Sequence, residues 1–293
     1  MNEQQSAESA ESPLQIFKDH SRLFHQNRFV YPVVSRRSRG ISVGVNLNPD
    51  KVCNFDCIYC QVDRRSESET KFVELDQVLE ELAAVLKLIS SGEIYADGKF
   101  ANMPEAFRRL NDIAFSGDGE PTTYRNFDQI IHQVAQVKRR LAGDARMVLI
   151  TNASMLHRPH VQEGLETMDH NNGQIWAKLE AGTDEYYQLI ERTKIPFRQI
   201  LDNITSAAKI RPLVIQSLFM NVDGEPPSQD ELRAFCDRLS EITAAGGQLQ
   251  LIQLYTVARQ PAESFVSALT EEQLQQISQL VISRTGLQTA VFP

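Results

Sequence analysis

The sequence predicts an α/β fold, an open partial TIM barrel of about six βα units. Short β-branched runs alternate along the chain with amphipathic stretches that have the 3.6-residue period of helices. Three of those stretches begin with the pattern of a capping box. This alternation favours parallel strands joined by right-handed crossovers, and a closed barrel would need eight such units.

The N-terminal residues 1–12 are polar and acidic and are expected to form a disordered tail. Residues 13–293 are expected to form a single domain that opens with a short helix at 14–25. Segment 91–111 is expected to be an irregular surface insertion. Strands are expected at 41–48, 112–117, 146–152, 174–180, 213–220 and 248–257, and helices at 76–90, 126–141, 154–168, near 183 and 197, at 228–242 and at 270–281.

The charge balance argues against a surface that attracts polyanions as a whole, because the net charge is −8 and the pI is near 5.4. The basic run Arg36-Arg37-Ser38-Arg39 is either a solvated face or a contact for the phosphate of a nucleic-acid or nucleotide substrate. No apolar run is long enough to span a bilayer, and the acidic N-terminus is unlike a signal peptide. We therefore expect a cytoplasmic protein with no membrane partner.

Three of the four cysteines, Cys53, Cys57 and Cys60, lie within eight residues directly after the first expected strand. Active sites of parallel α/β folds lie at the carboxyl ends of strands. Three thiolates there suit an iron–sulfur cube that keeps one iron free for a small molecule. A zinc site completed by a distant histidine and a disulfide with one free thiol are the alternatives. Cys236 lies far away on an amphipathic stretch and is expected to be a buried, inert thiol.

The spacing Cys-x3-Cys-x2-Cys, with Tyr59 before the last cysteine, resembles the signature of radical S-adenosylmethionine (SAM) enzymes. The resemblance implies one [4Fe–4S] cluster on the three cysteines, SAM on the open iron, and a low-potential electron donor such as flavodoxin or ferredoxin. It also implies reductive cleavage of SAM to a 5′-deoxyadenosyl radical that abstracts hydrogen from a substrate. Tyr59 is then a candidate contact for adenine, or a ring that shields the cluster.

A second motif, Ser116 to Thr122, follows the next expected strand and reads by itself as an ordinary Gly-Asp-Gly turn. In this position it resembles the Gly-Gly-Glu-Pro motif of the same family, which cradles the amino group of SAM. Gly119, Glu120 and Pro121 match that motif, whereas Asp118 replaces its first glycine. Gly119 and Glu120 are therefore candidate SAM contacts.

Alternation along strand 174–180 directs Trp176, Lys178 and Glu180 into the barrel, and the other side chains toward the helices. Two interior charges either pair with each other or bind a ligand. The family resemblance implies that Lys178 meets the SAM carboxylate or a substrate anion, and that Glu180 meets a ribose hydroxyl or the substrate. It also points to Asn152, at the end of another strand, as a ribose contact.

The substrate is not specified by these motifs. The pieces 38–42, 53–60, 116–122 and 254–259 resemble radical SAM proteins related to tRNA wyosine-base synthases, which makes RNA or a nucleotide a candidate substrate. The acidic net charge and the absence of cysteines for a second cluster count against that exact reaction. A glycyl-radical-activating enzyme with a protein partner and a non-catalytic scaffold that binds zinc or a cluster are the alternatives.

Overall fold

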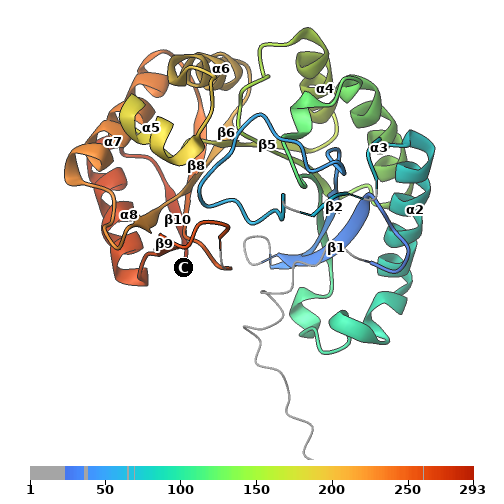
Figure 1. Ribbon diagram of the computed structural model, residues 1–293. Helices are drawn as coiled ribbons and strands as arrows, with labels where there is room; N and C mark the ends of the chain where they lie inside the picture. Colours follow the sequence, from blue (N-terminus) through green and yellow to red (C-terminus); the bar gives the residue numbers. More distant parts are fainter. Residues whose placement is uncertain (1–23, 36–38, 65, 69, 260) are drawn as a thin grey trace, which may run out of the picture.

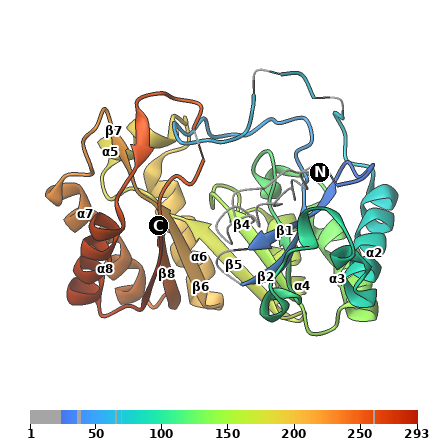
Figure 2. The same cartoon turned by 90° about the horizontal axis from the view of Figure 1, so that it is seen from below.

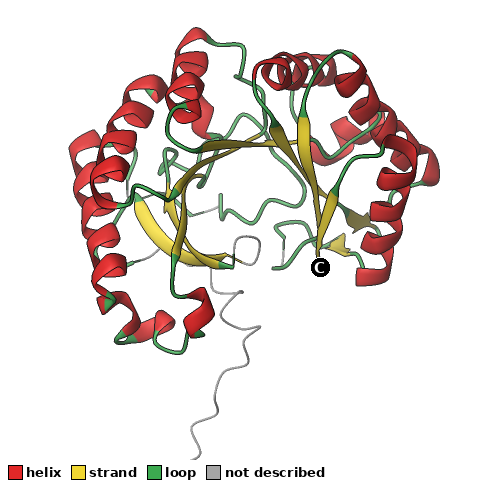
Figure 3. Ribbon diagram, turned by 180° about the vertical axis from the view of Figure 1, so that it is seen from behind, coloured by secondary structure: helices red, strands yellow, loops and turns green. Residues whose placement is uncertain are grey.

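The computed structural model describes residues 24–35, 39–64, 66–68, 70–259 and 261–293. Its eight-stranded sheet has the order β1-β2-β3-β4-β5-β6-β8-β10 and curls into a half-barrel with helices on its outer face (Figures 1 and 3). The strands are β1 (Val30–Ser35), β2 (Gly40–Val45), β3 (Leu110–Phe115), β4 (Arg146–Thr151), β5 (Gly173–Lys178), β6 (Leu213–Leu218), β8 (Leu249–Tyr255) and β10 (Thr289–Phe292). The helices are α2 (Leu75–Ser91), α3 (Phe127–Leu141), α4 (Pro159–Asp169), α5 (Asp184–Glu191), α6 (Phe197–Ile210), α7 (Gln229–Ala244) and α8 (Glu271–Thr285).

The open partial barrel of six βα units is confirmed, but the sheet has two further strands, β1 and β10, and the purely parallel pairing was wrong. The six expected strands correspond to β2, β3, β4, β5, β6 and β8. Strand β1 pairs antiparallel with β2, whereas the remaining neighbours in the sheet are parallel. Pro32 lies inside β1 and has no N–H to donate, so the sequence of residues 30–35 does not indicate a strand. A proline is tolerated there because β1 is an edge strand of the sheet. The expected strand 213–220 divides into β6 and β7 (Met220–Val222), and β7 pairs with β9 (Val266–Ala268).

Only one of the three expected capping boxes is complete, at Thr270 and Gln273 of α8. At α7 the Ser228 hydroxyl accepts from the Glu231 N–H, but the Glu231 side chain accepts from Gly182 and Thr183 instead. Helix α3 has no side-chain cap at all. The expected insertion between α2 and β3 consists of three short 3-10 helices, at Glu93–Tyr95, Gly98–Phe100 and Glu105–Phe107.

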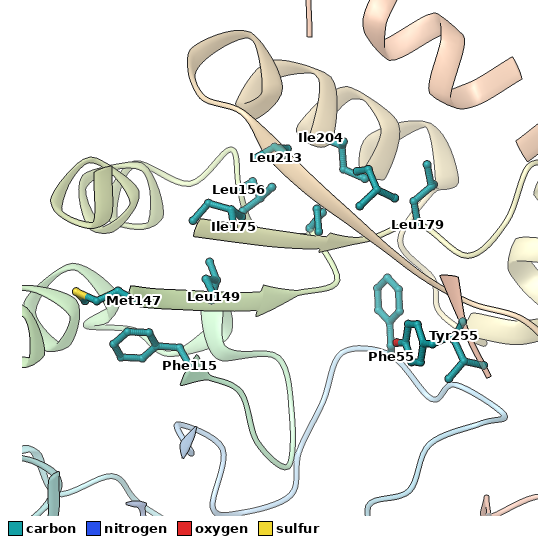
Figure 4. Packing of buried hydrophobic residues seen from close by; sticks show 14 of the residues in the cluster. Phe55, Phe115, Met147, Leu149, Leu156, Ile175, Leu179, Ile204, Leu213 and Tyr255 are labelled. Carbon is teal, nitrogen blue, oxygen red and sulfur yellow. The ribbon is translucent and has the colours of Figure 1, made fainter. Parts of the chain in front are cut away.

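The apolar core has two layers because the two faces of the curled sheet carry different side chains. The larger layer lies between sheet and helices and includes Phe115, Leu149, Ile175 and Leu213 (Figure 4). On the inner face Trp176 packs with Ala114, Val148 and Val214, a much smaller cluster. The predicted alternation along β5 is therefore confirmed, and the inner face leaves room for a cavity.

Several expectations fall on residues outside the described ranges. These are the acidic tail 1–12, nearly all of the helix at 14–25, and Arg36, Arg37 and Ser38 of the basic run. The described Phe24, at the end of the expected helix, forms an isolated bridge with Asn27. None of the helices in the described ranges is long and apolar enough to cross a membrane.

Candidate functional site

The cysteine segment lies on the connection between β2 and α2, which crosses from one half of the curled sheet to the other (Figure 2). Its backbone is held by the carboxyl end of α5, because Asp56 N–H donates to the Glu191 carbonyl (3.1 Å) and Ile58 N–H to the Ile190 carbonyl (2.9 Å). The Thr193 hydroxyl donates to the Asn54 carbonyl at 3.0 Å. These bonds join the cysteine segment to the half of the barrel opposite the strand from which it starts.

A cavity of about 390 Å³ lies between the cysteine segment and the carboxyl ends of the strands. Pockets of this size suit small molecules and cofactors. The cavity also reaches Gln216 on β6 and Tyr255 on β8, so both side chains point inward. All nine site residues expected from the sequence line it: Cys53, Cys57, Tyr59, Cys60, Gly119, Glu120, Asn152, Lys178 and Glu180.

The three thiols have different neighbours. The Cys57 thiol donates to a Glu191 carboxylate oxygen at 2.7 Å, whereas the Cys60 sulfur accepts from the Arg64 guanidinium at 3.5 Å. Burial raises the pKa of Cys57, and the nearby negative charge of Glu191 adds to that rise. Burial also raises the pKa of Cys53. Within the described ranges, no group of three or more His, Cys, Asp or Glu side chains is placed to hold a single metal ion.

The Glu120 carboxylate is buried and accepts four hydrogen bonds. Its donors are the hydroxyls of Thr122 (2.5 Å) and Thr151 (2.6 Å) and the backbone N–H groups of Thr122 (3.1 Å) and Asn152 (2.7 Å). Burial raises the pKa of Glu120, and these hydrogen bonds oppose the rise. Thr151 ends β4 and Asn152 follows it, whereas Glu120 follows β3, so this carboxylate fixes the two strand ends relative to each other.

Lys178, Glu180 and Tyr59 form one buried network. The Lys178 ammonium lies 3.2 Å from a Glu180 carboxylate oxygen and donates to the Tyr59 hydroxyl at 2.8 Å. The Tyr59 hydroxyl donates to the other oxygen of Glu180. Burial acts to lower the pKa of Lys178, but the surrounding acidic groups, Glu180 foremost, outweigh it and raise that pKa. Lys178 is therefore a fixed positive charge. The pairing expected for the two interior charges of this strand is confirmed, and both residues also line the cavity.

Asn152 connects the end of β4 to the cysteine segment. Its side-chain amide donates to the Asn54 side chain at 2.8 Å and its oxygen accepts from the Ser154 hydroxyl at 2.6 Å. The Asn54 amide in turn donates to Ser154 at 2.8 Å. These contacts position the residue between the first two cysteines.

Two residues of the site were missed from the sequence. Glu191 belongs to an amphipathic helix and meets Cys57 across 134 positions, so nothing local marks it. Arg64 follows Cys60 by four residues, a proximity that could have identified it. Cys236, as expected, is buried on α7 and away from the other thiols.

A family model described as the radical SAM superfamily matches residues 47–239. A UPF0026 protein of Helicobacter pylori strain J99 is 26% identical over 245 residues, which are 83% of this chain and 70% of that protein. A GTPase Obg of Brachyspira hyodysenteriae is 24% identical over 250 residues, so the chain spans about a third (32%) of that relative's length and 83% of its own. A solved structure of TYW1 with a lysine-pyruvate adduct bound has a TM-score of 0.51 at 17% identity and covers 84% of this chain and 74% of that one. This last likeness concerns the fold.

Proposed function

The chain belongs to the radical SAM superfamily, and from that premise we propose that Cys53, Cys57 and Cys60 hold the [4Fe–4S] cluster that this family uses together with SAM. The observation that carries the proposal is that all three cysteines of one short segment line a single cavity at the strand ends. The donor set fits the cluster, because three soft thiolates satisfy three irons of a cube. When bound, the cluster supplies an open iron for SAM and the electron that cleaves it.

The remaining cavity residues are proposed to bind and orient SAM. Gly119 lines the cavity and has no side chain, so its backbone can lie close to the ligand. A Cβ there would also lie 2.3 Å from the Val52 carbonyl oxygen, next to the cysteine segment. Glu120 holds the loop around it and would accept from the SAM amino group, while Asn152 would contact the ribose. Lys178 offers its charge to a carboxylate, and its hydrogen-bonded partners Tyr59 and Glu180 keep that charge in place.

The proposed reaction is reductive cleavage of SAM, followed by hydrogen abstraction from a substrate that the site does not identify. A low-potential one-electron donor of the flavodoxin or ferredoxin class supplies the electron. RNA or a nucleotide is the substrate class to test first, on the resemblance of the sequence motifs given above. RNA binding by the full chain that falls steeply with added salt would support an RNA substrate, and a lack of RNA binding at low salt would rule that substrate out.

The test is anaerobic reconstitution of the full chain, followed by analysis of iron and sulfide and of SAM cleavage under dithionite. Iron and acid-labile sulfide in equal amounts, with 5′-deoxyadenosine formed, are expected. Stoichiometric zinc without sulfide would overturn the proposal in favour of a zinc scaffold. A substrate whose deuterium label appears in 5′-deoxyadenosine would identify the abstracted hydrogen.

Alanine at Cys53, Cys57 or Cys60 is expected to abolish both cluster and SAM cleavage, since each removes one of three ligands. Cys236→Ala is the matched control, because that thiol is buried on α7. Cluster content in the control should equal that of the parent. A full cluster in Cys57→Ala would mean that the ligands are assigned wrongly.

A further inference from the structure

Arg64 closes the segment that carries the three cysteines. One terminal nitrogen of its guanidinium, Nη2, lies 3.5 Å from the Cys60 sulfur. The other, Nη1, donates to the Lys51 carbonyl at 3.1 Å, two residues before Cys53. The Nε atom is buried and finds no acceptor in the described part of the chain. The guanidinium is thus fixed between the two ends of the segment, and it lines the cavity.

The charges around the three sulfurs are distributed unevenly. On the side of Cys57, the Glu191 carboxylate is in contact, with Lys178 and Glu180 close behind. On the side of Cys60, the guanidinium of Arg64 is in contact with the sulfur, and it also acts on Cys53 together with Glu120. Arginine is always protonated in proteins, so this positive charge does not depend on pH.

A positive charge and a hydrogen bond at a cluster sulfur both stabilise the reduced cluster, which carries one more negative charge than the oxidised cluster. A cluster held by three thiolates gains one negative charge when it accepts an electron from an external one-electron reductant. No bond forms or breaks in that step, so its equilibrium depends on the charges and dipoles fixed around the cluster. Groups that contact the sulfurs without binding the metal are known to adjust potentials in this way.

We propose that Arg64 is a positioning residue that raises the reduction potential of the cluster on Cys53, Cys57 and Cys60 through its contact with the Cys60 sulfur. The proposal rests on the proposed function, because it requires that cluster. The guanidinium would hold the potential within reach of the electron donor.

The experiment is a redox titration of the reconstituted full chain in the absence of SAM, followed by the electron paramagnetic resonance signal of the reduced cluster. Arg64→Gln is expected to lower the ratio of reduced to oxidised cluster at least tenfold at a fixed potential, a shift of about 59 mV toward more negative values. Arg64→Lys keeps the charge and is expected to stay closer to the parent. Arg192→Gln is the matched control, since Arg192 lies next to Glu191 but pairs with Glu263.

A loaded Arg64→Gln protein with the parental potential would overturn the proposal, and so would an equal shift in Arg192→Gln. If Arg64→Gln holds no cluster, the Arg64→Lys variant is the deciding measurement. A reduction potential equal to the parent's in Arg64→Lys supports the proposal, and a tenfold lower ratio of reduced to oxidised cluster in that variant overturns it. A parent protein without iron and sulfide would instead overturn the proposed function. The two failures are therefore distinguishable.

Discussion

At the scale of single residues, the site is built from buried charges that neutral or opposite groups hold in place. Glu120 is 3% exposed and Glu180 2% exposed, and each is surrounded by hydrogen-bond donors. Isolated carboxylates at such depth would be costly. The donors limit that cost and also fix the direction in which each oxygen points, which is the preorganisation that a binding site requires.

The first prediction concerns the pH dependence of stability at Glu120. Its folded pKa lies above the unfolded value, so the folded state binds more protons than the unfolded state between these two values. The stabilising contribution is full below the unfolded pKa near 4.5 and is lost as pH rises through the folded pKa. In urea unfolding of the apo protein across that pH window, the unfolding free energy of the parent should therefore fall more steeply with rising pH than that of Glu120→Gln. Identical slopes would contradict the prediction.

The second prediction concerns Gly119, which lies against the residue before Cys53. A Cβ added there would lie 2.3 Å from the Val52 carbonyl oxygen, a backbone atom that cannot rotate away. Gly119→Ala is expected to cost about 1–3 kcal/mol of unfolding free energy and to lower iron loading, because the cysteine segment must shift. Gly143→Ala is the control, since its nearest neighbour would be 3.9 Å away. Parental loading in Gly119→Ala would show that the segment accommodates the methyl group.

At the scale of elements, two helices act through their contacts with neighbouring segments as well as through packing. The last carbonyls of α5 accept from Asp56 and Ile58 and so anchor the cysteine segment. On α2 the Glu81 carboxylate accepts from the backbone N–H groups of Arg28, Phe29 and Val30, where β1 begins. The edge strand that the sequence failed to indicate is thus tied to a helix by a buried side chain.

The third prediction tests that tie. Glu81→Gln replaces one acceptor oxygen by a donor, so at least one of the three N–H groups loses its partner. A buried unsatisfied donor costs about 1–3 kcal/mol, and urea unfolding should show a loss in that range. Glu80→Gln makes the same chemical change at the exposed neighbouring position of α2 and should leave stability almost unchanged. Equal effects of the two substitutions would refute the role of Glu81.

At the scale of the whole molecule, the curl of the sheet gathers the strand ends around one side of the cavity, and the cysteine segment covers the other (Figures 1 and 2). The strands end in Lys178 and Tyr255, and Asn152 and Glu180 follow just after β4 and β5. The connection between β2 and α2 contributes the thiols, Tyr59 and Arg64. The lining of this cavity therefore comes from both halves of the chain. Binding there should stabilise the fold as a unit.

The fourth prediction follows by linkage. SAM at 100 times its dissociation constant should raise the unfolding free energy of the cluster-loaded protein by about 2.7 kcal/mol. In Cys57→Ala the stabilisation should be smaller, because the open iron is missing as a ligand. Anaerobic thermal unfolding with and without SAM measures both. Equal shifts in the two proteins would place SAM away from the cysteine segment.

The sequence by itself determined the class of the fold and the cysteine spacing on which the proposed cluster site rests. The spacing of Cys53, Cys57 and Cys60 and the periods of strands and helices are properties of contiguous residues, so they can be recognised without a structure. The side chains on each face of β5 could be predicted for the same reason, since Trp176 and Lys178 alternate along the strand with residues of the larger apolar core.

Only the tertiary structure decided which groups meet around those cysteines. Glu191 contacts Cys57, and Tyr59 contacts Glu180, across more than a hundred positions of the sequence. The antiparallel strand β1 contains Pro32 and so was not predicted, and it is held by the Glu81 carboxylate. Such contacts depend on strand register, on the curl of the sheet and on the path of a long connection. These are set by the packing of the whole chain, so no local pattern records them.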